Sequence, residues 1–142
     1  MVRNLQQQNI LTIDSFLTNQ PIKILDIGCG LGIFDVAVYD YYGRNNNIKF
    51  YMVDKTTSSA EEKKIYYGYR PVASFYNNLD YTKEFMNING IPNENIVCIS
   101  VDNDIEKTKN KVKNMISDVD LVISIISWGV SLSGINIFRY GL

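Results

Sequence analysis

Length, composition and charge already narrow the range of functions. The chain has 142 residues, 46% of them hydrophobic and 20% charged, which suits a single domain over residues 1–142. Its 14 basic and 15 acidic residues nearly cancel, so we expect no nucleic-acid partner, because an excess of basic residues attracts such partners. The chain has no histidine, which excludes a serine-hydrolase triad or a zinc-hydrolase helix motif built from its own residues.

The first half of the chain predicts two helices and two strands. Apolar residues at helical intervals predict an N-terminal helix over residues 2–19. Residues 22–28 predict a strand, residues 33–43 a helix and residues 48–54 a second strand. We find no signal peptide and no apolar run of the roughly 20 residues that span a bilayer, so we expect a cytoplasmic protein without membrane contact.

The second half alternates in the same way after an irregular stretch. Residues 55–76 combine Ser, Gly and Pro with a cluster of tyrosines and predict an irregular excursion. Asn77, followed three residues later by Asp80, predicts the start of a helix that ends at Gly90. The remaining elements are a strand over residues 95–101, a helix over residues 104–117 and a strand over residues 120–127.

Strands that alternate with helices predict an α/β fold, a Rossmann-like three-layer sandwich with a mostly parallel sheet. Such sheets bind ligands at the carboxyl ends of their strands, near the point where the strand order reverses. This rule places residues 28–32, Asp54, Asp102 and Ser127 along one rim of the sheet.

The turn after the first strand carries three alternate glycines, Gly28, Gly30 and Gly32. A dinucleotide-binding turn needs G-x-G-x-x-G, and Ile33 occupies the position of its third glycine. A phosphate-binding P-loop is excluded as well, because no Lys-Ser or Lys-Thr pair follows the turn. An NAD-dependent oxidoreductase is therefore a less favoured interpretation, and a turn without any ligand is a further alternative.

The two cysteines, Cys29 and Cys98, lie in the glycine turn and in the third predicted strand. Their spacing suggests neither a metal site nor a disulfide framework. We expect them to be small buried thiols.

The turn together with the residue at the end of the strand reads Asp26-Ile27-Gly28-Cys29-Gly30-Leu31-Gly32. It resembles the D-x-G-x-G-x-G motif of class I S-adenosylmethionine-dependent methyltransferases. The physical logic agrees, because this cofactor is cationic and favours a nearby carboxylate, and glycines let the backbone approach it closely. The resemblance implies that S-adenosyl-L-methionine is bound by Asp26, Gly28, Cys29, Gly30 and Gly32.

The resemblance assigns further residues at the ends of the next two strands. Asp54 follows the glycines by roughly 20 residues, the interval expected for an acidic residue that binds ribose hydroxyls. Asp102, with Asn103 beside it, is implied to lie near the adenine. The alternative for Asp102 or Asp104 is a helix cap.

Residues 65–91 and 120–129 also resemble a bacterial subgroup, the sugar O-methyltransferases. This likeness implies O-methylation of a sugar or another small-molecule acceptor, with Ser127 and Trp128 beside that acceptor. The alternative for Trp128 is packing over the end of the sheet. Without histidine a catalytic base would be a carboxylate, a lysine or a tyrosine, and the sequence assigns none.

The family has a seven-stranded sheet, whereas about four strands are predicted here. We therefore expect an incomplete domain, truncated after the fourth strand, whose edge a missing segment or a partner would cover. Residues 130–132 also depart from the aromatic and histidine-bearing stretch of the subgroup. A truncated S-adenosylmethionine-binding module, or a pseudoenzyme without turnover, is the alternative function.

Overall fold

The computed structural model describes residues 8, 10–15, 17, 19–56, 78–102, 104–116 and 118–124. Residues 10–15 are helical, in agreement with the predicted N-terminal helix. The elements that follow are β1 (Lys23–Ile27), α2 (Ile33–Tyr41), β2 (Lys49–Asp54), α3 (Leu79–Ile88), a 3-10 turn (Asn93–Asn95), β3 (Ile96–Ser100), α4 (Ile105–Met115) and β4 (Leu121–Ile123). Most of the predicted excursion, residues 57–76, lies outside the described residues.

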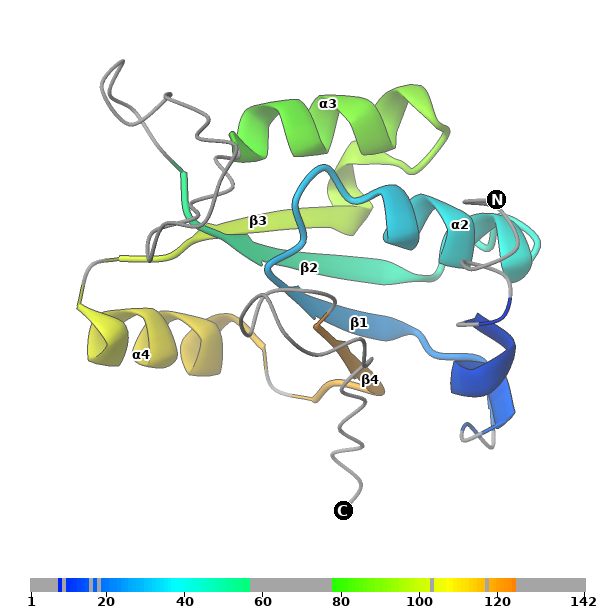
Figure 1. The fold of residues 1–142 in the computed structure, drawn as a ribbon, viewed down its shortest axis with the longest axis horizontal. Coiled ribbons are helices and arrows are strands. Elements are labelled where there is room, and N and C mark those ends of the chain that lie inside the picture. The colour runs from blue at the N-terminus through cyan, green and yellow to red at the C-terminus, as the bar shows by residue number, and fades with distance from the viewer. Residues whose placement is uncertain are drawn as a thin grey trace, which may run out of the picture.

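The four strands form one parallel sheet in the order β3-β2-β1-β4 (Figure 1). From β1 the chain steps to β2 and β3 on one side, and β4 then pairs with the opposite side of β1. The strand order therefore reverses between β1 and β4, which is where ligands bind in open α/β sheets. Within the described sheet β4 pairs with β1 alone, so β4 lies at one edge of that sheet, where the sequence places it.

Helices cover both faces of the sheet, which confirms the predicted Rossmann-like three-layer sandwich (Figure 1). One face packs against α2, α3 and the N-terminal helical residues, with a core that contains Ile13, Val38 and Met86. The other face packs against Val112 of α4 and Ile116, the residue that follows this helix. Successive residues of each strand alternate between the two cores, as the two-residue period of a strand requires.

One asparagine and one aspartate side chain cap the first turns of α3 and α4. The side chain of Asn78 caps α3 by accepting the N–H of Asp80, so the helix is capped one residue later than the spacing from Asn77 predicts. Asp104 caps α4 and accepts the N–H groups of Glu106 and Lys107. These caps satisfy N–H groups that lack partners within a helix.

The amino ends of β1 and β4 are joined by Asp120. Its Oδ2 accepts the N–H groups of Ile22 and Lys23, each at 2.8 Å, and its own N–H donates to the carbonyl of Lys23. This places β4 in register beside β1 and so fixes the switch point. None of the helices in the described part of the chain has the length and apolar character needed to cross a membrane.

Candidate functional site at the glycine turn

The turn between β1 and α2 is held in a left-handed backbone conformation. Gly28, Gly30 and Gly32 have φ values of 77°, 55° and 74°. Side chains with a Cβ disfavour this region by about 1–2 kcal/mol, so the three glycines meet a local requirement. The turn therefore brings bare backbone to the switch point of the sheet.

The backbone N–H groups of the turn donate to oxygens of neighbouring parts of the chain. The N–H groups of Gly28 and Cys29 both donate to the carbonyl of Val53, at 2.7 and 3.3 Å. The N–H of Gly30 donates to Asp54 Oδ2 at 2.8 Å, and the N–H of Gly32 donates to the carbonyl of Cys29 at 3.0 Å. These four donors are therefore already bound by oxygens of the chain.

The space beside the turn differs between two of its glycines. A Cβ built on Gly32 would lie 2.9 Å from Met86 Sδ and 3.2 Å from Met52 Cε, so this glycine allows close packing of the helix on the sheet. A Cβ built on Gly30 would meet nothing within 4 Å. Gly30 therefore borders open space that a ligand can approach.

Helix α3 is fastened to the turn by Thr82. This side chain is fully buried and its hydroxyl donates to the carbonyl of Gly30 at 2.7 Å. With Met86 one turn further along α3, the helix supports the turn from the face opposite α4.

Thr82→Val should lower the free energy of unfolding by about 1 kcal/mol, because it keeps the shape of the side chain and removes a buried hydrogen bond. Thr12→Val is the matched control, since the Thr12 hydroxyl donates to a helix carbonyl at an exposed position where water can replace it. Urea denaturation of the two variants measures the difference. Equal losses would contradict a supporting role for the Thr82 hydroxyl.

Asp26 and Asp35 form a buried carboxyl pair behind the turn. The side chain of Asp26 shares the α2 face of β1 with Ile24, and Asp35 lies in the first turn of α2. Asp26 is 3% exposed and Asp35 is 0% exposed. Burial raises the pKa of Asp26 to about 6, a hydrogen bond from Asp35 opposes this rise, and the charge of Asp54 adds to it. Burial and then the charge of Asp26 raise the pKa of Asp35 well above its usual range.

Asp54 and Cys29 complete an acidic environment around the turn. Asp54 ends β2, and its carboxylate accepts the N–H groups of Gly30 and Lys55. Burial, followed by the charges of Asp26, Asp54 and Asp35, raises the pKa of the Cys29 thiol. The thiol is therefore protonated at neutral pH, and the ionised groups that act on the turn are carboxylates.

The structure brings six of the predicted residues together. Five form the strand end and the turn, namely Asp26, Gly28, Cys29, Gly30 and Gly32, and the sixth, Asp54, contacts the turn directly. Asp102 is exposed at the carboxyl end of β3, where it accepts the N–H of Asp104 at 3.1 Å. The cap of α4 is Asp104 itself, and Asp102 supports it. Asn103, Ser127 and Trp128 lie outside the described residues.

Sequence reasoning missed Asp35. A signal was present, because Asp35 shares a helical face with Val38 and Tyr39, three and four residues later. That face is buried against the sheet, so a carboxyl on it demands a partner.

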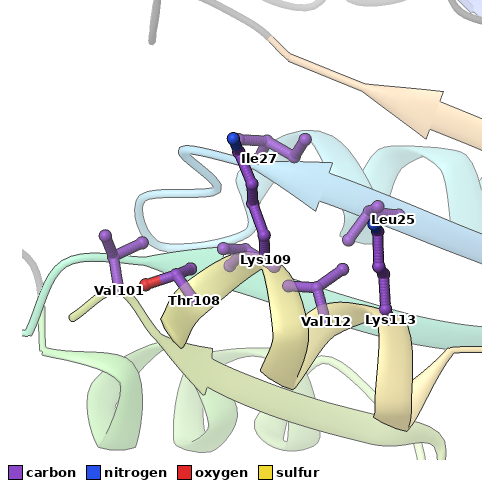
Figure 2. A pocket seen from close by; sticks show the side chains of 8 residues that line it. Leu25, Ile27, Val101, Thr108, Lys109, Val112 and Lys113 are labelled. Atoms are coloured by element: carbon purple, nitrogen blue, oxygen red, sulfur yellow. The ribbon is translucent and has the colours of Figure 1, made fainter. Parts of the chain in front are cut away.

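A cavity of about 310 Å³ lies between α4 and the sheet (Figure 2). Apolar side chains of the sheet form its floor, and Lys109 and Lys113 extend along it from α4 (Figure 2). Its lining consists of Leu25, Ile27, Val53, Val101, Thr108, Lys109, Val112 and Lys113. None of the residues predicted to bind the cofactor lines this cavity, so it is separate from the glycine turn. No group of acidic or sulfur ligands suited to a metal ion occurs among the residues that the structure describes.

No protein-family model matches the sequence, and no curated protein matches it. The chain is similar to a crystal structure from Nostoc punctiforme described as a putative O-methyltransferase, with 23% sequence identity and a TM-score of 0.42. The similarity covers 71% of this chain and 22% of that one. Because this identity and this TM-score are low, the fold is assigned from the strand order and the layers of the structure itself.

Proposed function

We propose that the protein is an S-adenosylmethionine-dependent methyltransferase that methylates a hydroxyl group of a small molecule such as a sugar. The observation that carries this proposal is the acidic glycine turn at the switch point of the sheet. Asp26 lies behind the turn and Asp54 binds it directly, so the ligand that suits it is positively charged and carries hydroxyl groups.

The hydrogen bonds of the turn argue against a pyrophosphate ligand. Dinucleotides and nucleoside phosphates are held by free N–H groups at a glycine turn and helix N-terminus. Here the N–H groups of Gly28, Cys29 and Gly30 are bound by Val53 and Asp54. The nearby carboxylates would also repel phosphate charge. This supports S-adenosylmethionine over NAD.

The residues present fit the proposed cofactor. The open space beside Gly30 lets a ligand reach the backbone, and Asp54 retains lone pairs for ribose hydroxyls beyond those that accept N–H groups. Asp26 supplies negative charge for the cationic portion, and Asp102 with Asn103 is proposed for the adenine. When bound, the cofactor supplies a methyl group already activated by its sulfonium.

The acceptor half of the proposal rests on the resemblance to sugar O-methyltransferases. We propose that Ser127 and Trp128, which follow β4 along the chain, lie beside the acceptor. Methyl transfer is an in-line displacement, so positioning of the acceptor hydroxyl is the main demand on these residues.

Calorimetry on the folded protein tests the cofactor assignment. S-adenosylmethionine and S-adenosylhomocysteine should bind, and NAD should not. Failure of both sulfur ligands to bind would overturn the proposal, and so would binding of NAD in their place. A methyl-transfer assay across sugar acceptors then tests the reaction, since binding without turnover would instead indicate a cofactor-binding module.

Gly30→Ala should weaken S-adenosylmethionine binding by about tenfold or more, because the new methyl group enters the open space beside the turn. Gly43→Ala is the matched control: Gly43 has a φ of 69° and no atom within 4 Å of a built Cβ, and it follows α2 at the opposite end. Both variants should lose about 1–2 kcal/mol of stability from backbone strain. Binding that weakens equally in both variants would refute a ligand contact at Gly30.

A further inference from the structure

The buried pair of Asp26 and Asp35 lacks partners for most of its oxygens. Asp26 Oδ1 and both carboxyl oxygens of Asp35 have no hydrogen-bond donor among the described residues. Two ionised carboxylates can only accept hydrogen bonds, so the contact between them is satisfied only when the pair holds a proton. Because Asp35 is the more deeply buried of the two, the proton belongs on Asp35.

We propose that Asp35 is a positioning residue of the cofactor site: it keeps the single proton of the carboxyl pair and donates a hydrogen bond to Asp26, which stays ionised and faces the cationic ligand. The choice of ligand rests on the proposed function. The pairing of the two carboxyls itself rests on the burial of Asp26 and Asp35 and on their unpartnered oxygens.

The surroundings of the pair leave its negative charge uncompensated. The ionisable groups that act on Asp26, Asp35 and Cys29 are Asp54 from β2, Cys98 from β3 and these three residues themselves. No lysine or arginine among the described residues contributes. An ionised Asp26 in this environment therefore attracts a cation strongly, because burial weakens the competing interaction with water.

This arrangement makes binding depend on pH. In the free protein the pKa of Asp26 is raised to about 6, and a bound cation lowers it by stabilising the ionised form. Affinity for S-adenosylmethionine should therefore be constant well above pH 6 and fall below it, approaching about tenfold per pH unit. S-adenosylhomocysteine, which lacks the sulfonium charge, should show a smaller decrease.

Two substitutions at Asp35 separate a hydrogen-bonding role from a structural one. Asp35→Asn keeps a donor to Asp26, so the midpoint of the affinity curve should stay near pH 6. Asp35→Leu removes the donor but suits the apolar surroundings, so the protein should stay folded while the midpoint moves to higher pH. At pH 7 the leucine variant should then bind S-adenosylmethionine about tenfold more weakly than the asparagine variant. Asp40→Leu, at an exposed position of the same helix, is the control and should leave the curve unchanged.

The experiment is calorimetry of S-adenosylmethionine and S-adenosylhomocysteine between pH 5 and 8, together with carbon-detected NMR titration of the Asp26 carboxyl in the ligand-free protein. An unshifted titration of Asp26 in the leucine variant would overturn the inference, and so would an asparagine variant that titrates like the leucine variant. The NMR measurement needs no ligand. Absence of binding at every pH would therefore overturn the proposed function. The NMR titration would still show whether Asp35 donates a hydrogen bond to Asp26.

Discussion

Gly32→Ala should lower the free energy of unfolding by about 3 kcal/mol, a large loss for a change of one methyl group. Part of the loss is backbone strain, because residue 32 has a φ of 74°. The rest is overpacking, because the added carbon would approach Met86 Sδ to 2.9 Å and Met52 Cε to 3.2 Å. Both methionines are fully buried, so their side chains have little room to move away.

Gly43→Ala separates the two contributions. It carries nearly the same backbone strain, with a φ of 69°, and no neighbouring atom for the new methyl group to meet. Its loss should be about 1–2 kcal/mol. Urea denaturation of both variants gives the comparison, and a Gly32 variant no less stable than the Gly43 variant would show that the helix does not need its close approach to Met86.

The ligand-free protein should become less stable as the pH rises from about 4 through 6. Folding raises the pKa of Asp26 from 3.8 to about 6, so the folded state binds a proton more tightly than the unfolded state. The resulting stabilisation is complete below pH 3.8 and is lost as the pH rises through 6. Its size is about 3 kcal/mol for Asp26, and the raised pKa of Asp35 extends the decline to higher pH.

Chemical denaturation at a series of pH values between 4 and 8 measures this decline. Asp35→Asn removes one of the two buried carboxyls, so it should flatten the curve and leave the protein more stable than the wild type above pH 6. Asp40→Asn provides the control on the same helix, since it breaks only an exposed ion pair with Arg44 that contributes little. Stability that rises with pH over this range would show that the pair is not protonated in the folded state.

The fold could be predicted from local patterns because each strand is a short apolar run and each helix has a buried face. The boundaries of α2, β2 and β3 fall within two residues of the predicted ones. The strand order could not be read from these patterns. It depends on which side of β1 receives β4, a choice fixed by contacts between distant residues such as Asp120 and Ile22.

The candidate site was predictable where a residue acts locally. Three glycines at alternate positions predict a turn. Asp54 ends the strand β2, in which Val53 pairs with Ile27 of β1. That register brings Asp54 beside the turn, and its bond to Gly30 follows. Asp35 was missed because the motif ends at Gly32, and only the packing of α2 on β1 shows that its carboxyl meets Asp26.

The protonation state of the Cys29 thiol matters if the turn holds an alkylating cofactor. A sulfonium methyl group is an electrophile, and a thiolate beside it would be open to self-methylation. Burial, followed by the charges of the carboxylates around the turn, raises the pKa of the Cys29 thiol, so it remains protonated and weakly nucleophilic. In the proposed methyltransferase, burial and the acidic surroundings would thus keep Cys29 from taking the methyl group meant for the acceptor.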